Sequence, residues 1–174
     1  MKLKIIIVFF FIFFVIHYAY AKPLKAGISY TVNEARIEAF TNTPNKIDIK
    51  KFAQNFSDPN YDKNKNAIKK NKLEFKNRFI YAFSDGTYCI TYKDNNKIGY
   101  YYNTDGSLYA IDIDINDTYP KKSIGYDING NIESVILILS EKEQYIFDLN
   151  KKLIAHWIGN NGYDENGNLF MTRD

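Results

Sequence analysis

The chain has 174 residues, a length that suggests one domain, and 17% of them are aromatic. Its formal net charge is only +3, which does not indicate nucleic-acid binding over the whole surface. Cys89 is the only cysteine, so an intrachain disulfide is excluded. Stability must therefore come from packing, for which 15 tyrosines and 13 phenylalanines supply large apolar rings.

The first 21 residues have the layout of a secretory signal peptide. Lys2 and Lys4 precede an unbroken apolar run over residues 5–16, and Ala19-Tyr20-Ala21 matches an A-x-A cleavage site. Cleavage after Ala21 is expected to release a secreted or periplasmic chain with a net charge of +1 and no stable membrane span. The alternative is an uncleaved N-terminal anchor, for which the apolar run is short, because a membrane span needs about 20 residues.

Residues 22–72 are predicted to form a helical segment. Thr31 and Glu34 match a capping box that predicts a first helix to residue 40, although the stretch 28–32 also alternates like a strand. Asp58 as N-cap and Pro59 at the first helical position predict a helix to about residue 70. Between these helices, apolar residues recur with helical spacing and predict another helix, at Ile49, Phe52, Ala53 and Phe56.

From Leu73 the apolar residues recur with period two, which predicts strands over residues 73–174. The strands are separated by turns such as Asp85-Gly86 and by one longer connection, 116–122, so sequential antiparallel pairing is expected. The segment Val135–Leu139 is apolar at every position and predicts a strand buried on both faces, one against the helices and the other against a curled-over sheet. The predicted fold class is α+β: short N-terminal helices followed by a twisted antiparallel β-meander of consecutive hairpins.

A seven-residue phrase recurs in this region: an aromatic, a polar residue, any residue, Asp or Asn, usually Gly, any residue, then Leu or Ile. The three best copies are 102–108, 126–132 and 163–169. Asp-Gly and Asn-Gly between apolar runs are a strong hairpin signal, because these residues tolerate positive φ. The phrase therefore predicts successive hairpins.

The phrase resembles the YD-type (RHS-like) hairpin repeats of bacterial surface proteins and, more loosely, MORN-like repeats, over about residues 81–173. Its copies are unevenly spaced, unlike those of long repeat arrays. In such families the repeats form scaffold and adhesion surfaces. The resemblance therefore implies a binding or structural role and assigns no active site.

Oxygen-bearing side chains alternate in two of the predicted turns, as they do in calcium loops. Neither stretch matches the EF-hand loop, and turn geometry alone accounts for Asp and Asn at such positions. The candidate calcium ligands are Asp127, Asn129, Asn131, Asp164, Asn166 and Asn168.

Two pairs of residues carry a hydrolase hypothesis. Asp112 and Asp114 share one face of a predicted strand, where paired carboxylates could act in glycoside hydrolysis, but a solvated outer face opposite a buried one is the favoured interpretation. Cys89 and His156 could pair as nucleophile and base, while inert packing is the simpler interpretation of a half-buried strand cysteine.

One cluster of basic residues lies at 63–78 and could dock an anionic polymer or a lipid surface, although a solvated helix in a Lys- and Asn-rich chain is the favoured interpretation. His156 and Trp157 could be an ordinary strand pair or part of an aromatic surface patch. The candidate binding surface comprises Lys63, Lys65, Lys69, Lys70, Lys72, His156 and Trp157.

Three functions are compatible with these features. The first is an exported, non-enzymatic binding or structural module of the bacterial envelope that presents an aromatic-rich sheet. The second is an envelope inhibitor or immunity-type protein that binds another protein through a sheet edge or face. The third is a small hydrolase that uses Asp112 with Asp114, or Cys89 with His156. No cofactor is expected, and the expected partner is another protein or an anionic envelope polymer.

Overall fold

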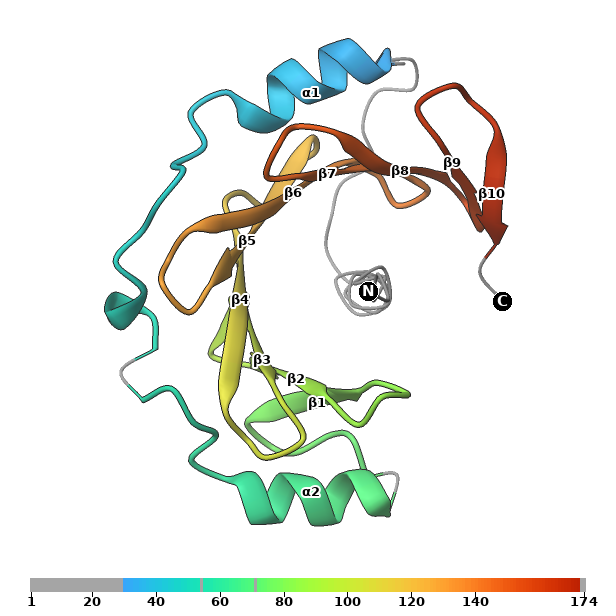
Figure 1. Cartoon of the computed structure of the whole chain (residues 1–174). Helices are drawn as coiled ribbons and strands as arrows, with labels where there is room; N and C mark the ends of the chain where they lie inside the picture. Colours follow the sequence, from blue (N-terminus) through green and yellow to red (C-terminus); the bar gives the residue numbers. More distant parts are fainter. Residues whose placement is uncertain (1–29, 54, 71, 173–174) are drawn as a thin grey trace, which may run out of the picture.

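A computed structural model describes residues 30–53, 55–70 and 72–172, and in these residues two short helices lie outside one curved antiparallel sheet of ten strands (Figure 1). The predicted α+β class therefore holds in outline, with strand dominating over helix. The predicted signal peptide, residues 1–21, lies outside the described residues, as do residues 28 and 29 of the stretch 28–32.

Helix α1 (Val32–Phe40) begins as the capping box predicts. The backbone N–H of Glu34 donates to Thr31 Oγ1 at 3.2 Å, and the N–H of Thr31 donates to Glu34 Oε2 at 2.7 Å. The two alanines of the buried helix face, Ala35 and Ala39, allow α1 to lie close to β6 and β7.

The predicted helix over residues 49–56 is wrong. Of the residues described in this stretch, 49–53 and 55–56, only Ile49–Lys51 form a helical turn, which is a 3-10 turn, and the others are irregular. The sheet takes the backbone groups that a helix would have used: the Tyr100 hydroxyl donates to the Phe52 carbonyl at 3.1 Å, and the Leu108 N–H donates to the Phe56 carbonyl at 3.0 Å. The apolar residues do recur at the spacing that suggested a helix, but the segment that carries them packs without helical structure beyond the 3-10 turn.

Helix α2 (Tyr61–Lys69) starts later than predicted, with Asn60 rather than Asp58 at the N-cap. The reason is that Asp58 has other partners. Its Oδ2 accepts hydrogen bonds from the Asn64 amide and the Tyr88 hydroxyl, both at 2.8 Å, while its Oδ1 accepts from the Asn60 N–H. This buried carboxylate joins α2 to the sheet.

The strands are neighbours in chain order, so the predicted meander is confirmed, and within the described residues β1 does not pair with β10. The first strand begins at Arg78 rather than Leu73, because Glu74 makes only an isolated bridge to Phe79. The strands are β1 (Arg78–Ala82), β2 (Tyr88–Tyr92), β3 (Asn95–Tyr102), β4 (Leu108–Asp114), β5 (Lys121–Asp127), β6 (Ile132–Ser140), β7 (Glu143–Asp148), β8 (Leu153–Ile158), β9 (Asn161–Tyr163) and β10 (Leu169–Thr172).

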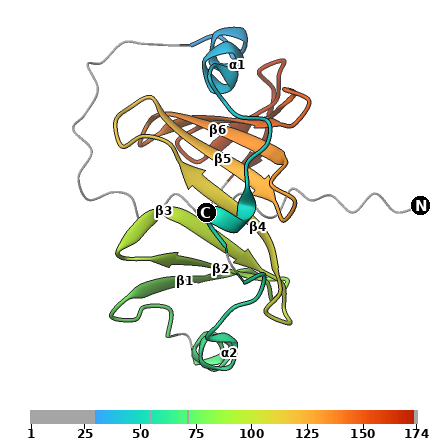
Figure 2. The same ribbon diagram turned by 90° about the vertical axis from the view of Figure 1, so that its left-hand side faces the viewer.

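The N-terminal segment, residues 30–70, runs along the outer face of the curved sheet (Figures 1 and 2). The largest hydrophobic core lies between this segment and the sheet, and it includes Ile90, Ile111, Tyr126 and Phe147. The double burial predicted for Val135–Leu139 is confirmed. Alternate residues of β6 join this core, while Ile136 packs on the opposite face with Trp157, next to Met171 of β10.

Tyrosine hydroxyls of the sheet hold the N-terminal segment along its length. Each of these three hydroxyls gains a partner, and three backbone carbonyls of the segment outside its two helices gain a donor. The donor and acceptor pairs are Tyr145 to Tyr30 at 2.7 Å, Tyr126 to Pro44 at 3.2 Å and Tyr100 to Phe52 at 3.1 Å.

The glycines of two phrase copies also contact the N-terminal segment. Gly130 has a φ of +76° and accepts a hydrogen bond from the Ile47 N–H at 2.8 Å, and a Cβ at this glycine would lie 2.1 Å from the Ile47 carbonyl oxygen. Gly106 has a φ of +82°, and a Cβ there would lie 2.5 Å from the Tyr61 ring. These two glycines thus allow the tight hairpin turn and also the close approach of the N-terminal segment.

We expect Gly130→Ala to destabilise the protein by about 3 kcal/mol or more, because left-handed backbone costs an alanine roughly 1–2 kcal/mol and the Ile47 carbonyl must also move. Gly167→Ala is the matched control: its φ is +79°, but nothing lies within 4 Å of the added Cβ. This variant should lose only the roughly 1–2 kcal/mol of stability that a left-handed backbone costs an alanine. Urea unfolding of both variants measures the difference, and equal losses would contradict the account.

Candidate functional site

The inner face of the sheet, opposite the N-terminal segment, is the candidate binding site. It is formed by the side chains of the other strand parity, among them Tyr81, Tyr101, Asp112, Ser134, Gln144 and Trp157. The helices contact the sheet elsewhere: α1 contacts β6 and β7, and α2 contacts β1, from the outer side. The inner face is curved along the sheet (Figure 1).

One end of the inner face, on β1 to β4, is aromatic. Phe83 and Tyr101 stack with their ring centroids 6.2 Å apart, and Tyr109 lies 6.0 Å from Tyr101. Cys89 and Ala110 complete this cluster. Tyrosine rings offer large contact areas with little loss of side-chain entropy, as in many binding surfaces.

The other end of the inner face, on β6 to β10, is apolar. Ile136, Ile146 and Trp157 form its centre. Gly162 leaves room for the indole, since a Cβ at this position would lie 3.1 Å from the Trp157 ring. Two apolar areas therefore lie at opposite ends of one curved surface.

Between these ends runs a polar band. The strand register places Asp112, Gly125 and Ser134 side by side on β4, β5 and β6. The Tyr101 hydroxyl donates to Asp112 Oδ2 at 2.8 Å. A Cβ at Gly125 would lie 2.6 Å from Ser134 Oγ and 2.9 Å from Asp112 Oδ1, so both side chains lean over the glycine.

Several polar atoms of the inner face lack hydrogen bonds to the described residues. They are Ser123 Oγ, Ser134 Oγ and both polar atoms of the Gln144 side chain, which is 3% exposed. Leaving a buried polar group unpaired costs about 1–3 kcal/mol, and native proteins contain few such groups. A bound partner that supplied donors and acceptors would remove this cost.

The Asp112 carboxyl is 5% exposed. Burial raises the pKa of Asp112 to about 7; the hydrogen bond from Tyr101 opposes the rise, and the Asp114 and Glu133 carboxylates add to it. The prediction of a solvated outer face at Asp112 is therefore wrong, although Asp112 and Asp114 do share one face while Ile111 faces the other way.

The pair Cys89 and His156 does not come together. Cys89 lies on the inner face of β2, whereas the His156 ring stacks on Tyr145 of the outer core, six strands away, with a centroid distance of 3.9 Å. Cys89 is also fully buried rather than half-buried, and burial raises the pKa of its thiol well above the usual range, which disfavours the thiolate. His156 Nε2 lies 3.0 Å from Glu143 Oε1 instead.

The candidate binding surface of lysines, His156 and Trp157 does not form one surface. The lysines lie on α2 or just after it, near β1, whereas His156 and Trp157 lie on β8 and point to opposite faces. Trp157 is 1% exposed. The lysines remain a separate exposed cluster on the outer side: Lys63, Lys65, Lys69, Lys70 and Lys72.

The candidate calcium ligands are occupied by the turns themselves. Asp127 Oδ1 accepts from the N–H groups of Asn129 and Asn131 at 2.8 Å each, and Asp164 makes the same bonds to Asn166 and Asn168. Hydrogen bonds with Asn168 lower the pKa of Asp164. Among the described residues, no three His, Cys, Asp or Glu side chains gather as a metal site. Turn geometry is thus the better explanation.

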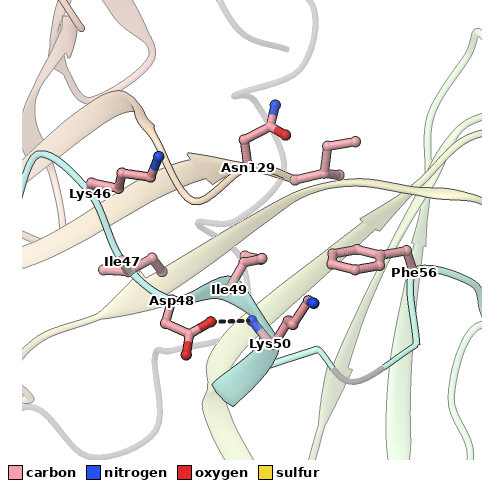
Figure 3. A pocket seen from close by; sticks show the side chains of 8 residues that line it. Lys46, Ile47, Asp48, Ile49, Lys50, Phe56 and Asn129 are labelled. Carbon is pink, nitrogen blue, oxygen red and sulfur yellow. Dashed lines mark hydrogen bonds between the residues drawn. The ribbon is translucent and has the colours of Figure 1, made fainter.

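A hollow of about 690 Å³ lies on the outer side between the N-terminal segment and the β5–β6 turn (Figure 3). Exposed Phe56 and Ile128 contribute apolar surface, and Lys46 and Lys50 flank it. Its walls belong to the junction that holds the N-terminal segment, and the described residues show no unpaired buried group among its lining. It is the weaker candidate site.

Comparison with known proteins gives no match: no family model fits the chain, and neither a curated protein nor a solved structure is similar to it at the level of a match. Within the parts of the chain that the structure describes, no helix has the length and apolar character needed to cross a membrane.

Sequence reasoning missed Gly125, Ser134 and Gln144. Their alternation with apolar residues was visible, but alternation alone does not tell which face the N-terminal segment covers. A signal was available at Gly125, since a glycine within a strand often marks a close approach of other groups.

We expect Asp112→Asn to become increasingly more stable than the wild type as the pH rises. The native carboxyl, with a pKa of about 7 against an ordinary 3.8, binds more protons than the unfolded one, so wild-type stability falls between about pH 4 and 7. The amide cannot ionise and keeps its acceptor for Tyr101. Thermal unfolding should place the variant about 3 °C or more above the wild type at pH 8. A difference that is independent of pH would contradict the assignment.

Proposed function

We propose that the protein is an exported, non-enzymatic binding module that holds a segment of another protein against the inner face of its sheet. The observation that carries the proposal is Gln144, whose buried side-chain amide has neither a donor nor an acceptor among the described residues. A protein backbone offers both kinds of group at every residue except proline. An acyl chain or another purely apolar ligand offers neither.

The surroundings of Gln144 support this role. The strand register places it between Ile138 and Trp157, so a segment bound there would lie on apolar neighbours. The aromatic cluster around Tyr101 lies at the other end of the same face. Aromatic anchors with a few buried polar contacts are the common composition of protein interfaces. The resemblance to hairpin repeats of bacterial surface proteins points in the same direction.

The absence of a catalytic role is part of the proposal. Cys89 and His156 lie on opposite faces, and Asp112 has a raised pKa and a hydrogen bond from Tyr101. The remaining acid pair, Asp112 with Asp114, differs in burial: Asp112 is buried and Asp114 is half-buried.

We expect Gln144→Leu to stabilise the protein and to weaken binding. Leucine has a similar volume and removes the unpaired amide, which should raise the free energy of unfolding by about 1 kcal/mol and the melting temperature by about 2–4 °C. A residue kept for function at the cost of stability behaves in this way. A loss of stability would show that the amide has a structural partner.

Binding is tested by capture from a native envelope fraction with the immobilised exported protein. A partner should be retained by the wild type and by Lys63→Gln/Lys69→Gln, a variant of the exposed α2 cluster, but lost with Gln144→Leu. Retention by Gln144→Leu together with loss in the lysine variant would overturn the proposal in favour of the outer surface.

A further inference from the structure

The hollow on the outer side is bounded by parts of the chain that lie far apart in the sequence. One wall is the stretch 46–50 with Phe56, and the other is the β5–β6 turn with Ile128 and Asn129 (Figure 3). Its volume of about 690 Å³ is within the range of about 300–1,000 Å³ that is usual for pockets that hold small molecules. We propose that this hollow binds an amphipathic anion, an aliphatic chain that carries one carboxylate, sulfate or phosphate head group. The inference goes beyond the proposed function, which concerns the opposite face of the sheet.

The apolar wall of the hollow would receive the aliphatic chain. Phe56 and Ile128 line it with 38% and 43% of their surface exposed, and the less exposed Ile47 and Ile49 complete the wall. Large apolar side chains that stay partly exposed around one concave surface are typical of a site for an apolar group. Contact with an aliphatic chain would remove apolar surface of both the protein and the ligand from water.

Two lysines line the hollow and supply its charge. Lys46 and Lys50 are both exposed, and they approach the hollow from separate points of its wall (Figure 3). Neither has an ion-pair partner among the described residues. A lysine ammonium is a compact charge at the end of a flexible stem, so both groups can turn toward the head group of a ligand. The site should therefore prefer an anionic amphiphile to a neutral one of the same chain length.

The acidic residue in the lining, Asp48, weakens this preference only in part. Its Oδ1 accepts a hydrogen bond from the Lys50 N–H at 3.3 Å, and in Figure 3 its carboxylate points away from Asn129. Two lysines and one aspartate leave the lining with a formal charge of +1. A bilayer surface fits less well than a single amphiphile, because anionic membranes attract clusters of about four to eight basic residues. The larger lysine cluster, on α2, does not line the hollow.

The test compares decanoate with decanol, which share one chain and differ in the charge of the head group. Amide NMR spectra of the isotope-labelled protein should show that both ligands shift the resonances of Lys50 and Asn129. At low salt the wild type should bind decanoate about tenfold more tightly than decanol, since two exposed charge pairs of modest strength add up to about this ratio. The ratio should fall as salt is added, because exposed charges are screened.

Three variants separate the head-group contacts from the apolar wall. Lys46→Gln/Lys50→Gln should abolish the preference for decanoate. Lys63→Gln/Lys69→Gln removes the same charge from α2 and should keep the preference. Ile128→Ser should weaken the binding of both ligands by a similar factor and keep the ratio between them. A melting curve of each variant shows that any change in binding comes from a folded protein.

Several outcomes would overturn the amphiphile site. They are equal affinity of the wild type for both ligands, a preference that survives Lys46→Gln/Lys50→Gln, and resonance shifts at Gln144 instead of at Asn129. Binding of neither ligand would overturn it as well, and binding to phosphatidylglycerol vesicles that Lys63→Gln/Lys69→Gln abolishes would then assign the outer surface to a bilayer. The proposed function can fail separately, because its test depends on Gln144 and on capture of a protein.

Discussion

The structure depends on covering the outer face of the sheet, because this face carries apolar side chains that must be removed from water. The cover is the N-terminal segment, which has little regular structure between α1 and α2 and therefore many backbone groups to satisfy there. The sheet supplies the partners through the hydroxyls of Tyr100, Tyr126 and Tyr145. At the end of the segment, Asp58 accepts from Asn64 and Tyr88, and the Arg78 guanidinium donates to Asn64 at 2.7 Å. Tyrosine is abundant partly because this cover needs hydroxyl donors at depth.

The same constraint explains why the inner face is different. Neither α1 nor α2 packs against that side, and Ser134 Oγ and the Gln144 side-chain amide are buried there without a hydrogen-bond partner among the described residues. Buried polar groups such as Gln144 and Ser134 would be unfavourable in a sheet that only had to fold. Their presence is the observation on which the proposed function rests.

Much of the fold could be predicted from residues whose effect is local. Thr31 and Glu34 fixed the start of α1, and the turn glycines fixed the hairpins, because capping and positive φ depend on near neighbours. The stretch 49–56 and Asp58 were mispredicted, because their partners are distant residues of the sheet. The site was less predictable for the same reason: Asp112 was recognised as a candidate, but its burial and its meeting with Ser134 over Gly125 arise from the register of three strands.

The central claim is that the N-terminal segment and the sheet form one cooperative unit. Native-state hydrogen exchange tests it most directly, through the amides of Ile47 and Asp58, which donate to Gly130 and Gly106 across the junction. We predict that both amides open with free energies within about 1 kcal/mol of those of Ile111 and Ile124 in the centre of the sheet. Opening free energies near zero for Ile47 and Asp58, with the central strands still protected, would show that the segment detaches and would contradict the account.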